Sequence, residues 1–305
     1  MGVLLCLVSA ACFAALGVFG KLAYDADVGV LTLLTVRFAM AAAGFGALTL
    51  VVPGARVRMK RRLVLVALGL GCVGYAAQAG LFFAALAHVD VSLLSLLLYT
   101  YPAFVTVAAI VLGRDQATRR RMASLGAASC GVALVLAGAG GGSADGIGVA
   151  MGIGAALAYT AYILVADTVI ADAPPLAFSA IITAGAFGTF FVISLATGSL
   201  DLRFQPAGWA WLACIAVVST IAAVLSFFAG LRRVGPSNAS ILSTFEPPVT
   251  VLLAFLVFGE HLGAVQLAGG ALVLSAVVLL QARATGTARR SPERSLEASP
   301  HPVPG

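Results

Sequence analysis

The sequence predicts an all-α integral membrane protein whose ten transmembrane helices form two inverted repeats of five. Three observations lead to this fold class. Hydrophobic residues make up 61% of the 305 residues and charged residues only 10%, whereas charged residues are about a quarter of a soluble domain. The chain divides into ten apolar runs, each near the length of about 20 residues that crosses a bilayer as a helix. A polar pattern in the first half also recurs 145 positions later in the second half.

The apolar runs are interpreted as helices, because a lone strand exposed to lipid would leave its backbone groups without hydrogen bonds. Short connections punctuated by proline or glycine separate them, as at Pro53, Pro174 and Pro206. The expected helices span approximately residues 3–23, 29–52, 63–87, 90–113, 120–138, 146–166, 175–197, 206–230, 236–258 and 262–282.

The helices group into two repeats with a linker and a tail. The first repeat covers residues 1–138, the second covers residues 146–282, and a glycine-rich linker at 139–145 joins them. Residues 283–305 lack apolar periodicity and predict a disordered cytoplasmic tail. Because five is an odd number of spans, the second repeat must enter the membrane from the opposite side, which makes the repeats inverted.

The distribution of Lys and Arg predicts the orientation. Of the 18 such residues, 15 fall in the tail or in connections that share one side with the N-terminus; the exceptions are Lys21, Arg203 and the intramembrane Arg37. Positive residues concentrate in cytoplasmic loops, so both termini are expected in the cytoplasm of a protein in the cell (inner) membrane. The basic rim would meet anionic lipid headgroups, which explains the pI of 9.4 without a nucleic-acid partner.

The duplicated polar pattern occupies one helix face in two of the most apolar stretches. Offsets of 0, 3, 7 and 10 residues return to the same side of a helix, so each copy draws a narrow polar line. A polar line inside lipid, present twice, indicates a pathway through the protein. The two copies are Ser92, Ser95, Tyr99 and Pro102, and Ser237, Ser240, Thr244 and Pro247.

A longer motif surrounds each polar line. The second-half copy runs from Phe227 to Glu260 with a Leu-Ser-Thr-Phe-Glu-Pro-Pro core and a closing Phe-Gly-Glu, and its weaker counterpart runs from Phe82 to Asp115. On these segments the chain resembles the ten-helix EamA type of the drug/metabolite transporter superfamily. In the weaker copy Tyr101 stands at the position of Glu246. The resemblance implies a secondary transporter, commonly an exporter of amino acids or related metabolites, with a central cavity between the halves.

Glu246 is the first candidate for a transport role. It lies near the middle of the ninth expected helix, where an acidic group costs about 2.5–3.5 kcal/mol on insertion scales. We expect its carboxyl group to exchange a proton or to contact a substrate ammonium. The alternative is a permanent charge pair with Arg37 of the second expected helix, and Arg37 could equally serve as a structural anchor.

Pro102 and Pro247 are the second candidates, as paired hinges. A proline inside a helix leaves the carbonyl four residues earlier without its partner, here at Leu98 and Ser243. We expect the two bends to shape a gate or cavity, with a static packing kink as the alternative.

Polar and aromatic residues at helical spacing predict the walls of the cavity. Buried tyrosine, glutamine and serine need hydrogen-bond partners in hydrocarbon, so they should face inward. Such a lining suits a small zwitterion with an apolar side chain. The expected substrate-binding residues are Phe13, Tyr75, Gln78, Ser95, Tyr99, Tyr159, Tyr162, Ser240, Ser243 and Thr244.

The sequence favours a carrier over an enzyme. It contains no HExxH pair, no cluster of carboxylates for magnesium and no P-loop, so no metal, cofactor or ATP-driven step is expected. We predict a secondary transporter that moves small metabolites by alternating access, with export of amino acids favoured and protons as a candidate coupling ion. Two alternatives stay open: a lipid-linked sugar flippase, which requires a lateral opening to lipid, and a membrane-embedded enzyme, which requires a catalytic cluster.

Overall fold

The described part of the chain is helical throughout its regular elements. It contains nine helices long and apolar enough to cross a membrane, together with a shorter apolar helix at Ala264–Leu279. The predicted all-α membrane fold with ten spans is therefore confirmed, and the chain is a multi-pass membrane protein. The computed structural model describes residues 1–52, 59–114, 116–138, 145–169 and 174–281.

The first half supplies five spans, two of which are irregular. The third span contains a π-helical turn, η1, and the fourth is broken into two short helices after Leu98. In chain order the elements are α1 (Gly2–Asp25), α2 (Val30–Val51), α3 (Arg61–Gly69), η1 (Leu70–Tyr75), α4 (Ala76–Leu86), α5 (Val91–Leu98), α6 (Tyr101–Val111) and α7 (Arg119–Gly138).

The second half repeats both irregularities in the same spans. A π-helical turn, η3, interrupts its third span, and its fourth is broken after Ser243. The elements are α8 (Gly146–Ala166), α9 (Pro175–Thr197), α10 (Pro206–Ala216), η3 (Val217–Ala222), α11 (Ala223–Val234), α12 (Pro236–Ser243), α13 (Glu246–Phe258) and α14 (Ala264–Gln281).

The observed helix bounds differ from the expected ones by a few residues. The largest difference is at the eighth span, which continues to Val234 rather than ending at residue 230. Arg232 and Arg233 continue the helix beyond the apolar run, and the chain leaves it at Gly235 with a φ of 80°, where glycine is favoured. The expected tail at 283–305 and all of the linker except Asp145 lie outside the described residues.

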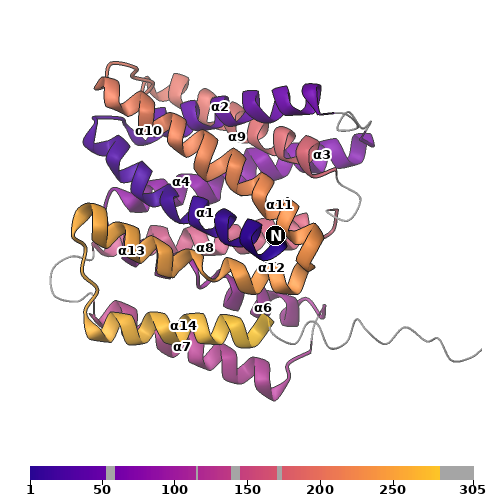
Figure 1. The fold of residues 1–305 in the computed structure, drawn as a ribbon, viewed down its shortest axis with the longest axis vertical. Coiled ribbons are helices and arrows are strands. Elements are labelled where there is room, and N and C mark those ends of the chain that lie inside the picture. Colours follow the sequence, from indigo (N-terminus) through magenta and orange to yellow (C-terminus); the bar gives the residue numbers. More distant parts are fainter. Residues whose placement is uncertain (53–58, 115, 139–144, 170–173, 282–305) are drawn as a thin grey trace, which may run out of the picture.

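The helices pack roughly parallel to one another, with α7 and α14 along one edge of the bundle and α2 against α9 near the other (Figure 1). When each helix is replaced by its counterpart in the other half, the pairs of helices in contact remain similar. Helix α1 packs on α11 as α4 packs on α8, and α1 packs on α13 as α8 packs on α5 and α6. Each half therefore completes its packing against the other half.

Two glycines allow the close approach of α7 and α14. A Cβ atom at Gly131 would lie 2.7 Å from the carbonyl oxygen of Gly269, and one at Gly269 would lie 2.6 Å from that of Gly131. Small residues at such crossings let helix backbones meet, which is how helices associate in a membrane without a hydrophobic driving force.

The two ends of the bundle carry different charges. We call one the acid-rich end, where Asp27, Asp90, Asp145, Asp201 and Glu260 lie on the connections. We call the other the arginine-rich end. It includes the N-terminus and, among the described residues, Lys60, Arg61, Arg62, Arg114, Arg119, Arg120, Arg121, Arg232 and Arg233.

Candidate functional site

A cavity of about 280 Å³ lies where helices of both halves meet. This is slightly below the ~300–1,000 Å³ of pockets for drug-sized ligands, so the space suits a small metabolite. A smaller space of about 40 Å³ shares Gln78, Leu98 and Glu246 with it. The larger cavity is lined by Phe13, Leu16, Arg37, Tyr75, Gln78, Ala79, Phe82, Phe83, Leu98, Tyr99, Tyr101, Tyr159, Phe227, Ser243 and Glu246.

The broken fourth span of each half brings polar groups to this cavity. Helix α5 ends at Leu98 and α6 begins at Tyr101, and 145 positions later α12 ends at Ser243 and α13 begins at Glu246. Pro102 and Pro247 were expected to bend a continuous helix, but each lies in the first turn of the second short helix. A proline fits there, because the first turn has no intrahelical partner for its N–H.

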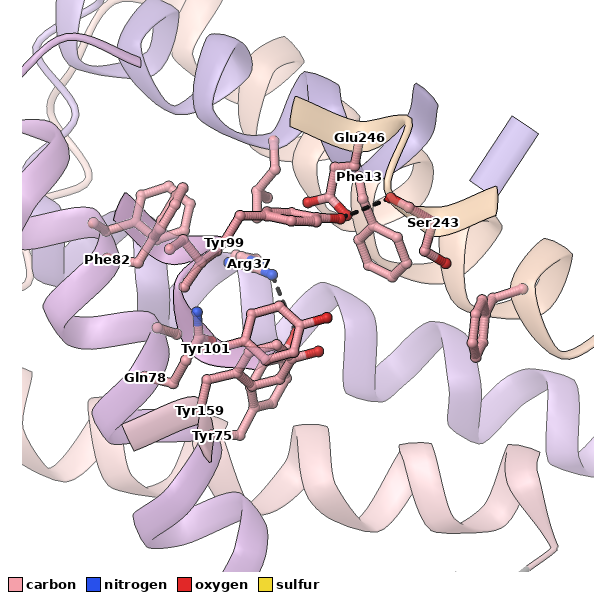
Figure 2. A pocket seen from close by; sticks show the side chains of 15 residues that line it. Phe13, Arg37, Tyr75, Gln78, Phe82, Tyr99, Tyr101, Tyr159, Ser243 and Glu246 are labelled. Carbon is pink, nitrogen blue, oxygen red and sulfur yellow. Dashed lines mark hydrogen bonds between the residues drawn. The ribbon is translucent and has the colours of Figure 1, made fainter. Parts of the chain in front are cut away.

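Tyr99 of the first half bridges the break in the second half. Its hydroxyl group is 2.8 Å from the carbonyl oxygen of Ser243 and 2.9 Å from Oε2 of Glu246, and it donates toward both (Figure 2). The Ser243 carbonyl is the group that Pro247 leaves without a backbone donor. Tyr99 is 4% exposed, so this bond substitutes for the missing one in a buried setting.

The geometry makes these two hydrogen bonds dependent on a proton. A phenol has a single proton, whereas a backbone carbonyl and an ionised carboxylate only accept hydrogen bonds. When Glu246 is protonated, its carboxyl group can donate to the phenol oxygen of Tyr99, and the phenol can donate its own proton to the Ser243 carbonyl. Both contacts are then full hydrogen bonds. When Glu246 is ionised, the single phenol proton is shared between Glu246 and Ser243.

Arg37 is the second charged residue of the cavity. Its side chain comes from α2, and the residue is only 2% exposed. Nη2 donates to the hydroxyl of Tyr75 at 3.3 Å, and Nε donates to that of Thr220 at 3.4 Å. The guanidinium carbon also lies 4.9 Å from the ring centre of Phe38. Tyr75 and Thr220 are 145 positions apart and belong to η1 and η3, so the two π-helical turns hold Arg37 from either side.

These partners offset the cost of burying a cation without supplying an opposite charge. Burial of a charge costs several kcal/mol, whereas each of the cation–π contacts with Phe38 and Phe83 contributes about 0.5–2 kcal/mol, and the two hydrogen bonds are long and go to neutral acceptors. Among the described residues, the ion pairs join Lys21, Asp90, Glu260, His88 and Asp145, and none joins Arg37 to Glu246. The permanent pair considered from the sequence is therefore not formed in this conformation.

Tyrosines form one wall of the cavity. The rings of Tyr101 and Tyr159 meet edge to face with centroids 4.6 Å apart, and Tyr162 stacks on Tyr159 at 6.0 Å. Tyr75 and Tyr99 extend the group at 5.9 Å from Tyr162 and 5.8 Å from Tyr101. Figure 2 shows Arg37 between the Tyr99–Glu246 pair and the rings of Tyr75, Tyr101 and Tyr159. This wall presents both aromatic faces and hydroxyl groups to the space.

Most of the expected site residues lie together, but not all. Ser95 lines only the smaller space. Tyr162 and Thr244 line neither: Tyr162 supports the wall from behind, and the Thr244 hydroxyl donates to the carbonyl of Ile241. Ser240 lies in α12, and its side chain is outside the described part of the structure. A substrate-binding role for these residues stays a prediction. The expected residues that line the larger cavity are Phe13, Arg37, Tyr75, Gln78, Tyr99, Tyr159, Ser243 and Glu246.

Sequence reasoning did not propose Tyr101 and Phe227 as cavity residues. Both line the cavity, and both carried a signal in the repeat pattern. Tyr101 occupies the position of Glu246 in the other half, and Phe227 lies 145 positions after Phe82. Projecting the candidate Glu246 through the repeat spacing would have found Tyr101, whereas Phe227 required its counterpart Phe82 to be a candidate as well.

A cluster at the acid-rich end ties together helices that line the cavity. Oε1 of Glu260 accepts from Nζ of Lys21 at 3.0 Å and from the backbone N–H of Val91 at 3.1 Å. Oε2 accepts from the N–H and hydroxyl of Ser92 at 3.0 and 2.8 Å. Lys21 also lies 3.7 Å from Asp90. We call these five residues the Glu260 clasp; it joins α1, the start of α5 and the end of α13.

The clasp satisfies its carboxylate. Burial by itself would raise the pKa of Glu260, but the hydrogen bonds from Ser92 and Lys21 and the charge of Lys21 outweigh it and lower that pKa. The acid at this position is therefore held in its ionised form by its own protein.

The fold and the site define a class: a multi-pass α-helical membrane protein with a polar cavity between two similarly built halves. The model of the EamA-like transporter family matches the chain twice, over residues 1–137 and 146–281. The chain belongs to this family of transporters within the drug/metabolite superfamily.

Two further similarities accompany the family match. An uncharacterized transporter of Archaeoglobus fulgidus is 34% identical over 95 residues, a match that covers 30% of this chain and 35% of that protein. A crystal structure of another protein, 16% identical, covers 93% of this chain and 98% of its own with a TM-score of 0.63. At that identity the second similarity shows the fold alone.

Proposed function

We propose that the chain is a secondary transporter that exports small metabolites, with amino acids favoured, across the cytoplasmic membrane by alternating access. The observation that carries this proposal is the cavity at the two broken spans, where Tyr99 of one half meets Glu246 and Ser243 of the other. Broken helices at the junction of repeated halves are where secondary transporters bind their substrates.

The two halves support alternating access as inverted repeats. Each has five spans, with a π-helical turn in the third and a break in the fourth, and their contacts are similar on exchange. When two similar units have opposite orientations, they can pack against each other in two equivalent ways. One arrangement opens the site to one side of the membrane, and the other opens it to the opposite side. The residues of the cavity come from both units, so a change of packing would carry the same site from one side to the other.

The contacts of Tyr99 favour proton coupling. Loss of a proton from Glu246 would change which acceptor receives the Tyr99 hydroxyl, and one acceptor is the Ser243 carbonyl at the break. The protonation state would thereby bias the geometry between α12 and α13. A charge that crosses the whole membrane gains about 2.3 kcal/mol per 100 mV, which is sufficient to drive accumulation of a substrate.

The charge distribution favours one orientation. The N-terminus and nine of the described Lys and Arg residues lie at the arginine-rich end, and positive residues concentrate on the cytoplasmic side. We therefore place the arginine-rich end and both termini in the cytoplasm, and the Glu260 clasp on the opposite side.

Transport by purified protein in liposomes tests this proposal. The full chain is reconstituted, and uptake of a panel of labelled amino acids is followed with and without an imposed pH gradient, beside protein-free liposomes of the same lipid. We expect saturable uptake of at least one amino acid that depends on the direction of the gradient. If no amino acid exceeds the protein-free background under either gradient, the amino-acid proposal is wrong.

A further inference from the structure

Arg37 has features that the transport cycle described above does not use. It lines the cavity and is 2% exposed, and the two hydrogen bonds it donates go to the neutral hydroxyls of Tyr75 and Thr220. A guanidinium group has five N–H donors, so this arrangement leaves capacity for another acceptor. No acidic side chain among the described residues lies at ion-pair distance from it.

The repeat shows that packing alone does not require an arginine here. The position 145 residues after Arg37 is Ile182, an apolar residue. Ile182 is buried in an apolar cluster that includes Leu70 of η1, and its backbone passes close to Gly71 of the same turn. The same place between α9 and η1 is thus filled by a hydrocarbon side chain in one half. In the other half, between α2 and η3, it is filled by a cation.

The two π-helical turns fix the orientation of this cation. Tyr75 from η1 and Thr220 from η3 hold Nη2 and Nε, and the ring of Phe83 lies 5.2 Å from the guanidinium carbon. A planar guanidinium held in one orientation binds a carboxylate through two parallel hydrogen bonds, which a flexible ammonium group does not reproduce.

We propose that Arg37 is the anion-binding subsite of the cavity and takes the carboxylate group of the transported molecule. The inference rests on the proposed transport function and adds the residue that recognises the carboxylate of the substrate. A ligand with its carboxylate at Arg37 has Glu246 available in the same cavity for an ammonium group, and the tyrosine wall for an apolar side chain. These three features describe a zwitterionic α-amino acid with an apolar or aromatic side chain.

Two matched series of ligands test the carboxylate requirement. They are L-phenylalanine, L-phenylalaninamide and 2-phenylethylamine, and L-leucine, L-leucinamide and isopentylamine. Within each series the ammonium group and side chain stay, while the carboxylate becomes a neutral amide or is removed. Equilibrium binding to the purified full-length protein and uptake into liposomes are both measured, because the two readouts separate recognition from transport.

Three variants accompany the wild type. Arg37→Met removes the cation and keeps an unbranched side chain about as long as the aliphatic part of arginine, and Arg37→Lys keeps the cation and removes the planar fork. Lys21→Met removes a cation from the Glu260 clasp, outside the cavity, and is the matched control. Gel filtration and thermal unfolding establish that each variant is folded.

We expect the wild type to bind at least one of the two amino acids ten times more tightly than its amide. Arg37→Met should reduce that preference to less than twofold, Arg37→Lys should give an intermediate value, and Lys21→Met should leave it unchanged. If Arg37→Met does not fold, an unchanged preference in Arg37→Lys overturns the inference.

The other results overturn the inference in distinguishable ways. Equal binding of amino acid and amide by the wild type, or a full preference in Arg37→Met, removes the carboxylate subsite while transport stands. If the wild type neither binds nor transports any member of either series, the inference is wrong. The proposed function is then judged by the wider amino-acid panel.

Discussion

The Glu260 clasp and the central cavity both contain acidic and basic side chains, but they treat these charges differently. In the clasp, Glu260 has a cationic partner in Lys21 and three further donors from Val91 and Ser92. Within the described parts of the chain, the hydrogen-bond partners of the Arg37 and Glu246 side chains in the cavity are neutral hydroxyl groups. Among these residues, one set of charges has an ionic partner and the other set has none.

The difference separates a structural role from a binding role. A carboxylate with four donors is stable without a ligand and serves to hold three helices together at one end. Buried charges with neutral partners are costly unless a ligand or proton completes them. On this comparison we propose that the clasp holds the acid-rich end together and that the cavity binds the substrate or a proton.

The same substitution in the two regions should have opposite effects. Glu246→Gln keeps the hydrogen-bonding shape but fixes a neutral group, so we expect it to abolish gradient-driven transport. The melting temperature should stay near that of the wild type, because no ion pair is lost. Glu260→Gln, the matched control, should retain transport and lower the melting temperature. Full transport by Glu246→Gln in liposomes would contradict the assignment of Glu246.

Tyr99→Phe isolates the hydroxyl group that joins the two halves. It removes the donor to Ser243 and Glu246 while the ring remains in contact with Tyr101. A hydrogen bond to a charged group contributes about 1.5–3 kcal/mol, so the initial rate of gradient-driven uptake should fall by roughly tenfold or more. Tyr24 does not itself line the cavity, and its hydroxyl donates to the backbone carbonyl of the lining residue Phe83. Tyr24→Phe removes a tyrosine hydroxyl without touching the Phe83 ring, so it is the control and should transport normally. Equal rates for both variants would remove Tyr99 from the coupling mechanism.

Loss of the clasp should loosen the acid-rich end by a smaller amount. Glu260→Gln removes the charge that holds Lys21. The Glu260 side chain is 7% exposed, and that of Lys21 is 28% exposed. We expect the free energy of unfolding to fall by about 1–2 kcal/mol, since one partner remains partly solvated. Chemical unfolding in mild detergent measures this change. A variant as stable as the wild type would show that the clasp does not hold the end closed.

The smallest effect expected is on the pH dependence of stability. Because the pKa of Glu260 is lowered by folding, its stabilising contribution is present above the unfolded value of about 4.3 and is lost as the pH falls through the lower folded value. The difference in melting temperature between the wild type and Glu260→Gln should therefore shrink as the pH is reduced from 6 to about 3. A difference that stays constant over this range would contradict a clasp based on an ionised Glu260.

Much of the fold was predictable from the sequence, because a helix that crosses the lipid hydrocarbon needs about 20 consecutive, mostly apolar residues. Apolar runs of sufficient length identified the ten spans, and the repeat spacing paired Pro102 with Pro247 in the fourth span of each half. The π-helical turns at Leu70–Tyr75 and Val217–Ala222 were not predicted, since apolar periodicity does not distinguish a wider turn from an ordinary one. The break before Pro247 was expected as a bend, because the sequence does not show where the tertiary partner Tyr99 replaces a backbone hydrogen bond.

The candidate site was predictable in composition and less so in geometry. A buried glutamate and inward tyrosines follow from the cost of polar groups in hydrocarbon. Which polar residues face the cavity depends on helix rotation, and this separated Tyr159 from Tyr162 and Ser243 from Thr244. Ser92 was part of the polar line but belongs to the clasp, because Glu260, far away in the sequence, binds it.

Alternating access requires that one cavity between the halves opens in turn to each side of the membrane. Leu98 lines both the larger and the smaller space, so its replacement by cysteine in a background without the five native cysteines reports on access. The direct measurement is the labelling rate by a membrane-impermeant thiol reagent, applied to either face of sealed vesicles. We expect labelling from both faces, in a ratio that shifts with the imposed pH gradient. Labelling from one face only, whatever the gradient, would contradict it.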